Sequence, residues 1–188
     1  SPDAPKTDVP ASNRSLAAAP SVKAANKAVS DFLDFSDRED FALAERGFIA
    51  TFDDGKIMTE DGTLAYDFGE YDFLAGGAPD TVNPSLWRQS QLAAKHGLFK
   101  VTDGIYQVRA FDLSNITFIA GDTGWLVVDP LISKETAARA KALVDRELGE
   151  RPISAVIFTH SHADHYGGVR GLIDEADGEN GVRIIAPD

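Results

Sequence analysis

The chain has 188 residues, 43% of them hydrophobic and 26% charged, a balance typical of a globular domain with a core of useful size. Its formal net charge of −12 at pH 7 argues against binding to nucleic acids or to anionic membrane surfaces, since both select basic faces. The absence of cysteine excludes disulfides, thiolate metal sites and cysteine nucleophiles. No apolar run reaches the 18 residues that suggest a transmembrane helix.

The first 20 residues are rich in Pro, Ala, Ser and Asp, and we expect a flexible tail at residues 1–20. Residue 1 is Ser and the single Met is Met58, so the start of the chain is expected to have been processed or removed. The tail is typical of a mature end after signal removal, or of a segment added for expression. We therefore expect a periplasmic or secreted bacterial protein, although the lack of cysteine fits a cytosolic protein equally well.

Two helices are predicted next. Residues 21–33 place apolar side chains along one side of an amphipathic helix. A second, short helix is expected to start at Ser36, where Glu39 three residues on completes a capping box, and to end at Gly47.

Three hairpins and a helix follow. Asp61-Gly62 predicts a turn between short strands, and Asp103-Gly104 predicts another between residues 98–101 and 105–108. The third hairpin pairs residues 115–120 with 125–129. Between the first two, Asn83-Pro84 marks the start of a helix that is expected to run to His96.

A βαβ unit is expected after the hairpins. Residues 133–148 read as a helix, and residues 153–159 form a short, nearly all-apolar strand. This strand should lie parallel to the strand at 125–129. A further helix is predicted at 169–176 and a further strand at 182–186.

The run from His160 to His165 holds three of the four histidines and follows the buried strand directly. Ligands of open α/β sheets bind at this end of the strands. His160 and His162 are two residues apart and can bind one cation, while Asp164 and His165 can reach a second position. Imidazole nitrogen and carboxylate oxygen suit zinc, and to a lesser extent iron or manganese. The alternative is a polar surface loop with incidental histidines.

Two neighbouring features support a metal site. Asp129 ends the adjacent parallel strand and should lie close to the histidine run, where a carboxylate could orient a ligand; the alternative is an ordinary turn aspartate. Gly167-Gly168 removes side-chain bulk where the backbone must fold back.

The pattern His160-x-His162-x-Asp164-His165 resembles the signature of the metallo-β-lactamase superfamily. Flanking segments are similar to the zinc-dependent alkyl sulfatases that hydrolyse dodecyl sulfate: residues 83–89, 96–101, 111–115, 121–125 and 159–171. The resemblance implies a four-layer αββα sandwich, with residues 21–188 forming the N-terminal part of the catalytic domain. It further implies that His160 and His162 bind one zinc ion and that Asp164 and His165 bind the other.

The same resemblance implies hydrolysis of alkyl sulfates by a water that two zinc ions activate, with Asp164 the catalytic candidate within this chain, and a homodimer. The family's other metal ligands, its dimerisation segment and its C-terminal domain come later than residue 188, so the remaining part of the protein, or a second polypeptide, is expected to complete the site. The 188 residues alone are expected to be inactive. The alternatives are another hydrolase of the superfamily, such as a thioesterase or lactamase, and a non-catalytic fragment that acts only in folding or interaction.

Overall fold

A mixed sheet organises the molecule. The computed structural model describes residues 17–174, 176–177 and 181–188, and these contain a seven-stranded sheet in the order β1-β4-β5-β6-β7-β8-β9. None of the helices in these ranges combines the length and the apolar character that crossing a bilayer requires. The fold is therefore mixed α/β, as the sequence predicts.

Antiparallel pairing builds the first part of the sheet. It joins β1 (Phe48–Ala50), β4 (Gly97–Thr102), β5 (Ile105–Arg109), β6 (Ile116–Ala120) and β7 (Trp125–Val128). A separate small hairpin pairs β2 (Lys56–Met58) with β3 (Leu64–Asp67). In the β4–β5 turn Gly104 has a φ of 75°, the left-handed conformation that explains the Asp-Gly signal there. All three predicted hairpins are confirmed.

The rest of the sheet is parallel. From β7 the chain passes through α4 (Lys134–Leu148) to β8 (Ile153–Ile157), which pairs with β7 in parallel, and β9 (Arg183–Ile185) pairs in parallel with β8. The Ser133 side chain caps α4 by accepting from the Thr136 amide, and Gly149 ends it with a φ of 87°. The predicted βαβ unit is confirmed.

The core lies between α4 and one face of the sheet. Fully buried side chains from the strands meet a buried stripe on α4 (Leu98, Val108, Ile116, Phe118, Val127, Val156; Ala137, Ala140, Leu143, Val144). Trp125 is 2% exposed and packs edge-on against Tyr106 and Phe118, so it fills part of the core. This packing holds the ends of β7 and β8 in fixed positions.

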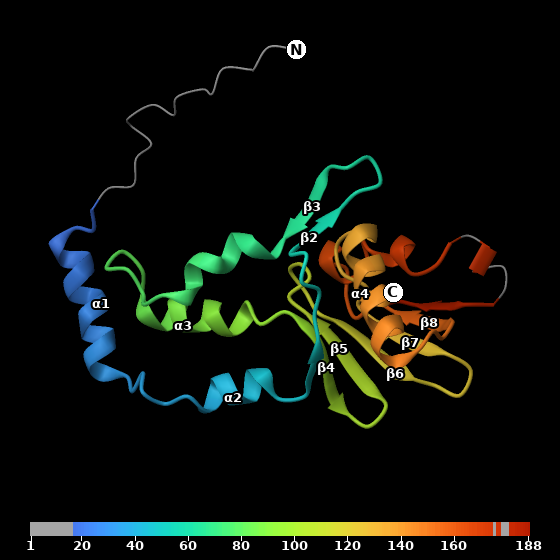
Figure 1. The fold of residues 1–188 in the computed structure, drawn as a ribbon, viewed down its shortest axis with the longest axis horizontal. Coiled ribbons are helices and arrows are strands. Elements are labelled where there is room, and N and C mark those ends of the chain that lie inside the picture. Colours follow the sequence, from blue (N-terminus) through green and yellow to red (C-terminus); the bar gives the residue numbers. More distant parts are fainter. Residues whose placement is uncertain (1–16, 175, 178–180) are drawn as a thin grey trace, which may run out of the picture.

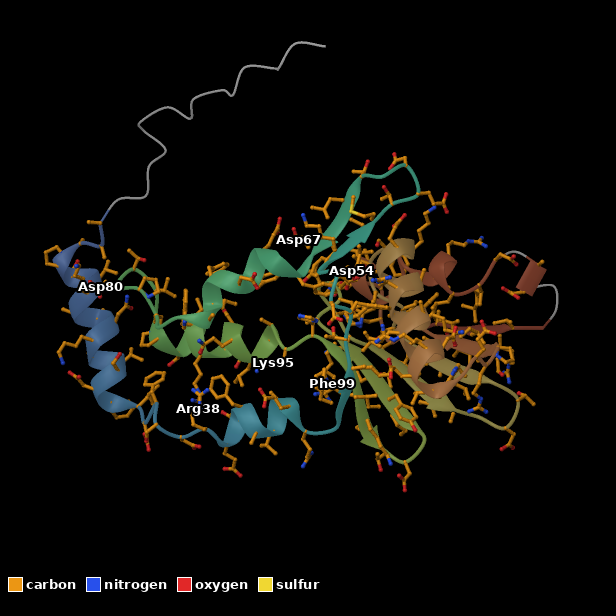
Figure 2. The ribbon with its side chains drawn as sticks, in the orientation of Figure 1. Arg38, Asp54, Asp67, Asp80, Lys95 and Phe99 are labelled. Atoms are coloured by element: carbon orange, nitrogen blue, oxygen red, sulfur yellow. The ribbon has the colours of Figure 1, made fainter. Side chains whose placement is uncertain are left out.

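The N-terminal elements extend away from the sheet (Figure 1). They are α1 (Pro20–Phe32), α2 (Glu39–Glu45), α3 (Pro84–Ala93) and the 3₁₀ segment η2 (Phe68–Ala75). Polar contacts tie the helices to one another: Lys23 of α1 pairs with Asp80 before α3, and Lys95 after α3 pairs with Glu45 of α2 (Figure 2). The predicted tail at residues 1–20 falls largely outside the described residues, which begin at residue 17.

Two predicted helix boundaries are wrong. The second helix starts at Glu39 rather than Ser36, because the Ser36 hydroxyl and amide both donate to Asp34 and form no capping box. Helix α3 ends at Ala93, before His96, whose ring instead contacts Thr51 and stacks on Phe68.

Within the span 169–176, predicted to be one helix, the structure has the 3₁₀ turn η4 (Val169–Gly171) and then residues 172–174, which are not helical. Residue 175 lies outside the described residues, and residue 176 is helical. A Cβ on Gly171 would lie 2.1 Å from the carbonyl oxygen of Lys134, so this segment crosses the start of α4 at backbone contact. Packing against α4 therefore decides its path, rather than its own helical pattern.

Candidate metal centre

The histidine run lies at the edge of the sheet where several loops meet. Strands β7 and β8 are parallel and both end at this edge, and β6, antiparallel to β7, begins there. The edge therefore brings together residues 110–115, the turn that begins at Asp129, and residues 158–168. The sheet and α4 fix the base of each loop.

Asp129 is the centre of this arrangement. It has a φ of 55°, and its amide donates to the carbonyl of Ile157 at 3.0 Å, which holds it beside β8. One carboxylate oxygen accepts from the Thr159 amide at 2.8 Å. The other accepts from the Thr159 hydroxyl at 2.7 Å and from Nδ1 of His165 at 2.8 Å. Asp129 thus contacts the histidine run directly.

The charge of Asp129 is supported by these donors. Burial raises the pKa of this carboxyl, but the hydrogen bonds from the Thr159 amide, from His165 and from the Thr159 hydroxyl outweigh burial and leave the pKa below its ordinary value. Asp129 is therefore a carboxylate at neutral pH and a strong acceptor for an imidazole N–H.

The hydrogen bonds also set the tautomers of two histidines. His165 donates from Nδ1 to the carboxylate of Asp129, so in the neutral ring the lone pair lies on Nε2. The single proton of the Thr159 hydroxyl goes to Asp129, so Nδ1 of His160, 2.9 Å from that hydroxyl, must be the donor in their contact. In the neutral ring of His160 the lone pair then also lies on Nε2.

The remaining candidate ligands lie close by. The ring centroids of His160 and His165 are 4.0 Å apart, and those of His160 and His162 are 4.7 Å apart. A carboxylate oxygen of Asp164 lies 3.3 Å from Nε2 of His165. The structure therefore gathers the four residues that the sequence singles out, two of them, His160 and His162, on the exposed side of the loop.

These donors suit a metal ion in their chemistry but do not enclose one. Zinc and related cations bind imidazole nitrogens with free lone pairs and carboxylates. A histidine that binds a metal usually donates its other ring N–H to a carboxylate, a backbone carbonyl or water, as His165 does to Asp129. Nevertheless, no group of three or more His, Asp or Glu side chains among the described residues is arranged to hold an ion. The residue types suit a metal ion, and the assignment of these four residues as ligands stays a prediction.

A second carboxylate braces the loops from the side. Asp112 accepts from the Thr136 hydroxyl at 2.6 Å, from the Ile132 amide at 3.0 Å and from the Ser114 amide at 3.2 Å. The Ser114 hydroxyl in turn donates to the backbone carbonyl of Asp164. Burial raises the pKa of Asp112, and these hydrogen bonds only partly offset it. The hydrogen bonds that run from Thr136 through Asp112 and Ser114 to Asp164 therefore fix the backbone of the histidine run.

Sequence reasoning assigned no role to Asp112 or Ser114. Both lie within the segment 111–115 that resembles the alkyl sulfatases, and that resemblance was the signal that could have found them. The partners that join them to the other loops lie 20 to 50 positions further along the chain, so spacing alone could not reveal these contacts.

Gly167 and Gly168 let the loop pack tightly. A Cβ on Gly168 would lie 2.0 Å from the carbonyl oxygen of Pro130, and one on Gly167 would lie 2.3 Å from that of Ile132. The amide of Gly168 donates to Leu131 at 2.8 Å. The turn thus presses the histidine run against the loop that carries Asp129.

Comparison with known proteins finds one matching family model and several similar proteins. The family description "Metallo-beta-lactamase superfamily" matches residues 109–182. A linear primary-alkylsulfatase from a Pseudomonas species is 54% identical over 168 residues, covering 88% of this chain and 25% of the relative. An alkyl/aryl-sulfatase from Saccharomyces cerevisiae is 49% identical over 170 residues, covering 89% of this chain and 26% of the relative.

The solved structure of a stereoselective inverting sec-alkylsulfatase from a Pseudomonas species superimposes with a TM-score of 0.84 at 46% identity, covering 91% of this chain and 27% of that one. The fold is therefore the metallo-β-lactamase fold of these sulfatases. The chain spans about a quarter of the length of the curated relatives that it matches.

Proposed function

Because residues 109–182 belong to the metallo-β-lactamase superfamily, we propose that the complete protein is a metal-dependent alkyl sulfatase, which hydrolyses alkyl sulfate esters to an alcohol and inorganic sulfate. The family and the identities of 54% and 49% to named alkylsulfatases support the substrate class. The observation that carries the metal chemistry is the set of hydrogen bonds from Asp129 and Thr159 to Nδ1 of His165 and His160. These contacts leave Nε2 of both rings free to bind a metal ion.

The superfamily implies metal ions, and we propose two zinc ions. His160 and His162 would hold one, and Asp164 and His165 would hold the other. Bound metal ions of this kind lower the pKa of water and neutralise an anionic substrate group. Ligands beyond these four are expected from the remaining part of the protein, because a catalytic zinc normally has three protein ligands.

The residues of this chain orient that chemistry. Asp129 keeps a proton on Nδ1 of His165 and directs Nε2 of the ring toward Asp164, which lies 3.3 Å away. Ser114 holds the backbone of Asp164 from the other side. Local positive charge is needed because the sulfate ester is an anion and the chain carries a net charge of −12. Cations at the histidine run would reverse the sign of the local field.

The assembly and the location of the protein belong to the same proposal. We expect a homodimer that is exported to the periplasm or secreted. Light scattering on the purified full-length protein and fractionation of the producing cells would measure both. A monomer would contradict the expected homodimer, and a protein found only in the cytosol would contradict the expected export. Neither result would bear on the proposed activity.

A substrate panel tests the activity. The metal-loaded full-length protein should release inorganic sulfate from dodecyl sulfate and leave a thioester and a β-lactam intact. Cleavage of the thioester or the lactam without sulfate release would assign another hydrolase function within the superfamily. No cleavage of any of the three would favour a non-catalytic role.

A further inference from the structure

Left-handed backbone gathers at the edge of the sheet that carries the histidine run. In the described part of the chain, the non-glycine residues with a positive φ are Ala110 at 55°, Asp129 at 55° and Leu131 at 64°. A positive φ is uncommon outside glycine, and for a bulky residue such as Leu131 it costs free energy. Residues of this kind persist only where neighbouring contacts hold them, and they cluster at functional sites. The contacts that hold them therefore bear on the site.

The turn that follows β7 contains two of these residues. The Leu131 amide donates to the carbonyl of Asp129 at 2.9 Å, so the chain reverses sharply around Pro130. The side chain of Leu131 is fully buried, and its carbonyl accepts from the amide of Gly168 at 2.8 Å. The turn sets the position of Asp129, whose carboxylate accepts from Nδ1 of His165. Its shape therefore decides where this candidate ligand lies.

Asp112 ties this turn to two other elements. One of its carboxylate oxygens accepts from the Ile132 amide at 3.0 Å, at the end of the left-handed turn. The same oxygen accepts from the Thr136 hydroxyl at 2.6 Å, in the first turn of α4. The other oxygen accepts from the Ser114 amide at 3.2 Å, within the 110–115 loop. Hydrogen bonds to a charged acceptor are the stronger kind, so one carboxylate can hold three elements together.

Through these contacts Asp112 acts on two candidate ligands, each by way of one other residue. The Ser114 hydroxyl donates to the backbone carbonyl of Asp164, the first of the two. The turn carries Asp129, whose carboxylate accepts from Nδ1 of His165, the second. All of these hydrogen bonds join protein atoms, so they hold the loops in place before an ion binds.

We propose that Asp112 is a positioning residue for the metal centre. It holds the left-handed turn at residues 129–132 and the loop at residues 110–115 against α4, so that Asp164 and His165 keep the geometry that a metal ion needs. The inference rests on the proposed function and adds to it the residue that preorganises the site. Preorganised ligands bind more tightly because the cost of ordering them is met when the protein folds rather than when the ion binds.

Zinc affinity of the full-length protein, measured by competition with a chromogenic chelator, tests this role. Asp112→Ala removes the acceptor of all three donors and should weaken zinc binding by about 10–100-fold, the loss typical of residues that hold metal ligands in place. Asp112→Asn can keep its oxygen toward Ile132 and Thr136, but its NH₂ group then faces the Ser114 amide. Its loss should therefore be smaller, about three- to tenfold, which corresponds to one hydrogen bond.

A control and a second readout separate positioning from general stability. Asp145→Asn changes another partly buried carboxylate, which lies near the far end of α4 and pairs with Lys141, so it should bind zinc within about twofold of the unaltered protein. Cobalt(II) bound in place of zinc gives visible bands that depend on the coordination geometry. These bands should change in Asp112→Ala and stay the same in Asp145→Asn. A purely structural role would lower the melting temperature and leave both readouts unchanged in the folded protein.

Thermal melts identify a temperature at which the variants are folded, and if Asp112→Ala does not fold, Asp112→Asn alone decides. Zinc affinity within about twofold of the unaltered protein, with unchanged cobalt bands, would overturn the role of Asp112. An equal loss in Asp145→Asn would also overturn it. Sulfate release from dodecyl sulfate by the unaltered protein tests the proposed function separately, so an active enzyme whose Asp112 variants bind zinc normally contradicts only the positioning role. An unaltered protein that binds no zinc contradicts both.

Discussion

Asp129→Asn would remove the charge that holds His165 while keeping the shape of the side chain. Asp129 has a φ of 55°, a conformation that Asn tolerates, so the backbone should be preserved. The carboxylate accepts from the Thr159 amide on one oxygen and from the Thr159 hydroxyl and His165 on the other. An amide group has one oxygen, so in either orientation its NH₂ faces an N–H donor.

The cost follows from these contacts. A hydrogen bond to a charged group contributes about 1.5–3 kcal/mol, and losing the acceptor of a metal-binding histidine typically weakens metal affinity by about 10–100-fold. We expect that loss for zinc in the full-length protein, measured by competition with a chromogenic chelator. Asp103→Asn is the control, because Asp103 lies in the β4–β5 turn with its side chain 97% exposed. Zinc affinity of Asp129→Asn within twofold of the unaltered protein would refute the role given to Asp129.

Three further predictions concern the same edge of the sheet. Gly168→Ala should destabilise the fold by about 1–3 kcal/mol, because the added Cβ would meet Pro130, whereas Gly76→Ala has open space and should melt unchanged; equal melting temperatures would contradict the packing argument. Ser114→Ala should lower the free energy of unfolding in urea by about 1–3 kcal/mol, because it leaves the carbonyl of Asp164 unpaired, and an unchanged value would count against the brace. Asp164→Ala should lower the zinc content found by elemental analysis, and full occupancy would remove its assignment as a ligand.

Elements with local signals could be predicted from the sequence. The Asp103-Gly104 turn and the Asn83 start of α3 each depend on residues within a few positions, and both occur. The parallel order of β7 and β8 follows from the handedness and length of a βαβ connection. That order alone places Asp129 beside the histidine run.

Elements that depend on distant contacts could not be predicted in this way. The pattern of Ser36 and Glu39 is that of a capping box, yet Asp34 competes for the serine. His96 lies beyond the end of α3, where its ring contacts the Thr51 hydroxyl and stacks on Phe68. Only the folded chain brings these residues together. In the site, the histidine run was visible as a motif, whereas the brace through Asp112 depends on tertiary contacts.

The most direct test of the account is sulfate release from dodecyl sulfate by the full-length protein, measured before chelation, after removal of metal, and after zinc is restored. The account predicts release that chelation abolishes and zinc recovers, and predicts that His162→Ala does not recover under the same zinc concentration. Sulfate release that survives complete metal removal, or that His162→Ala retains in full, would contradict it.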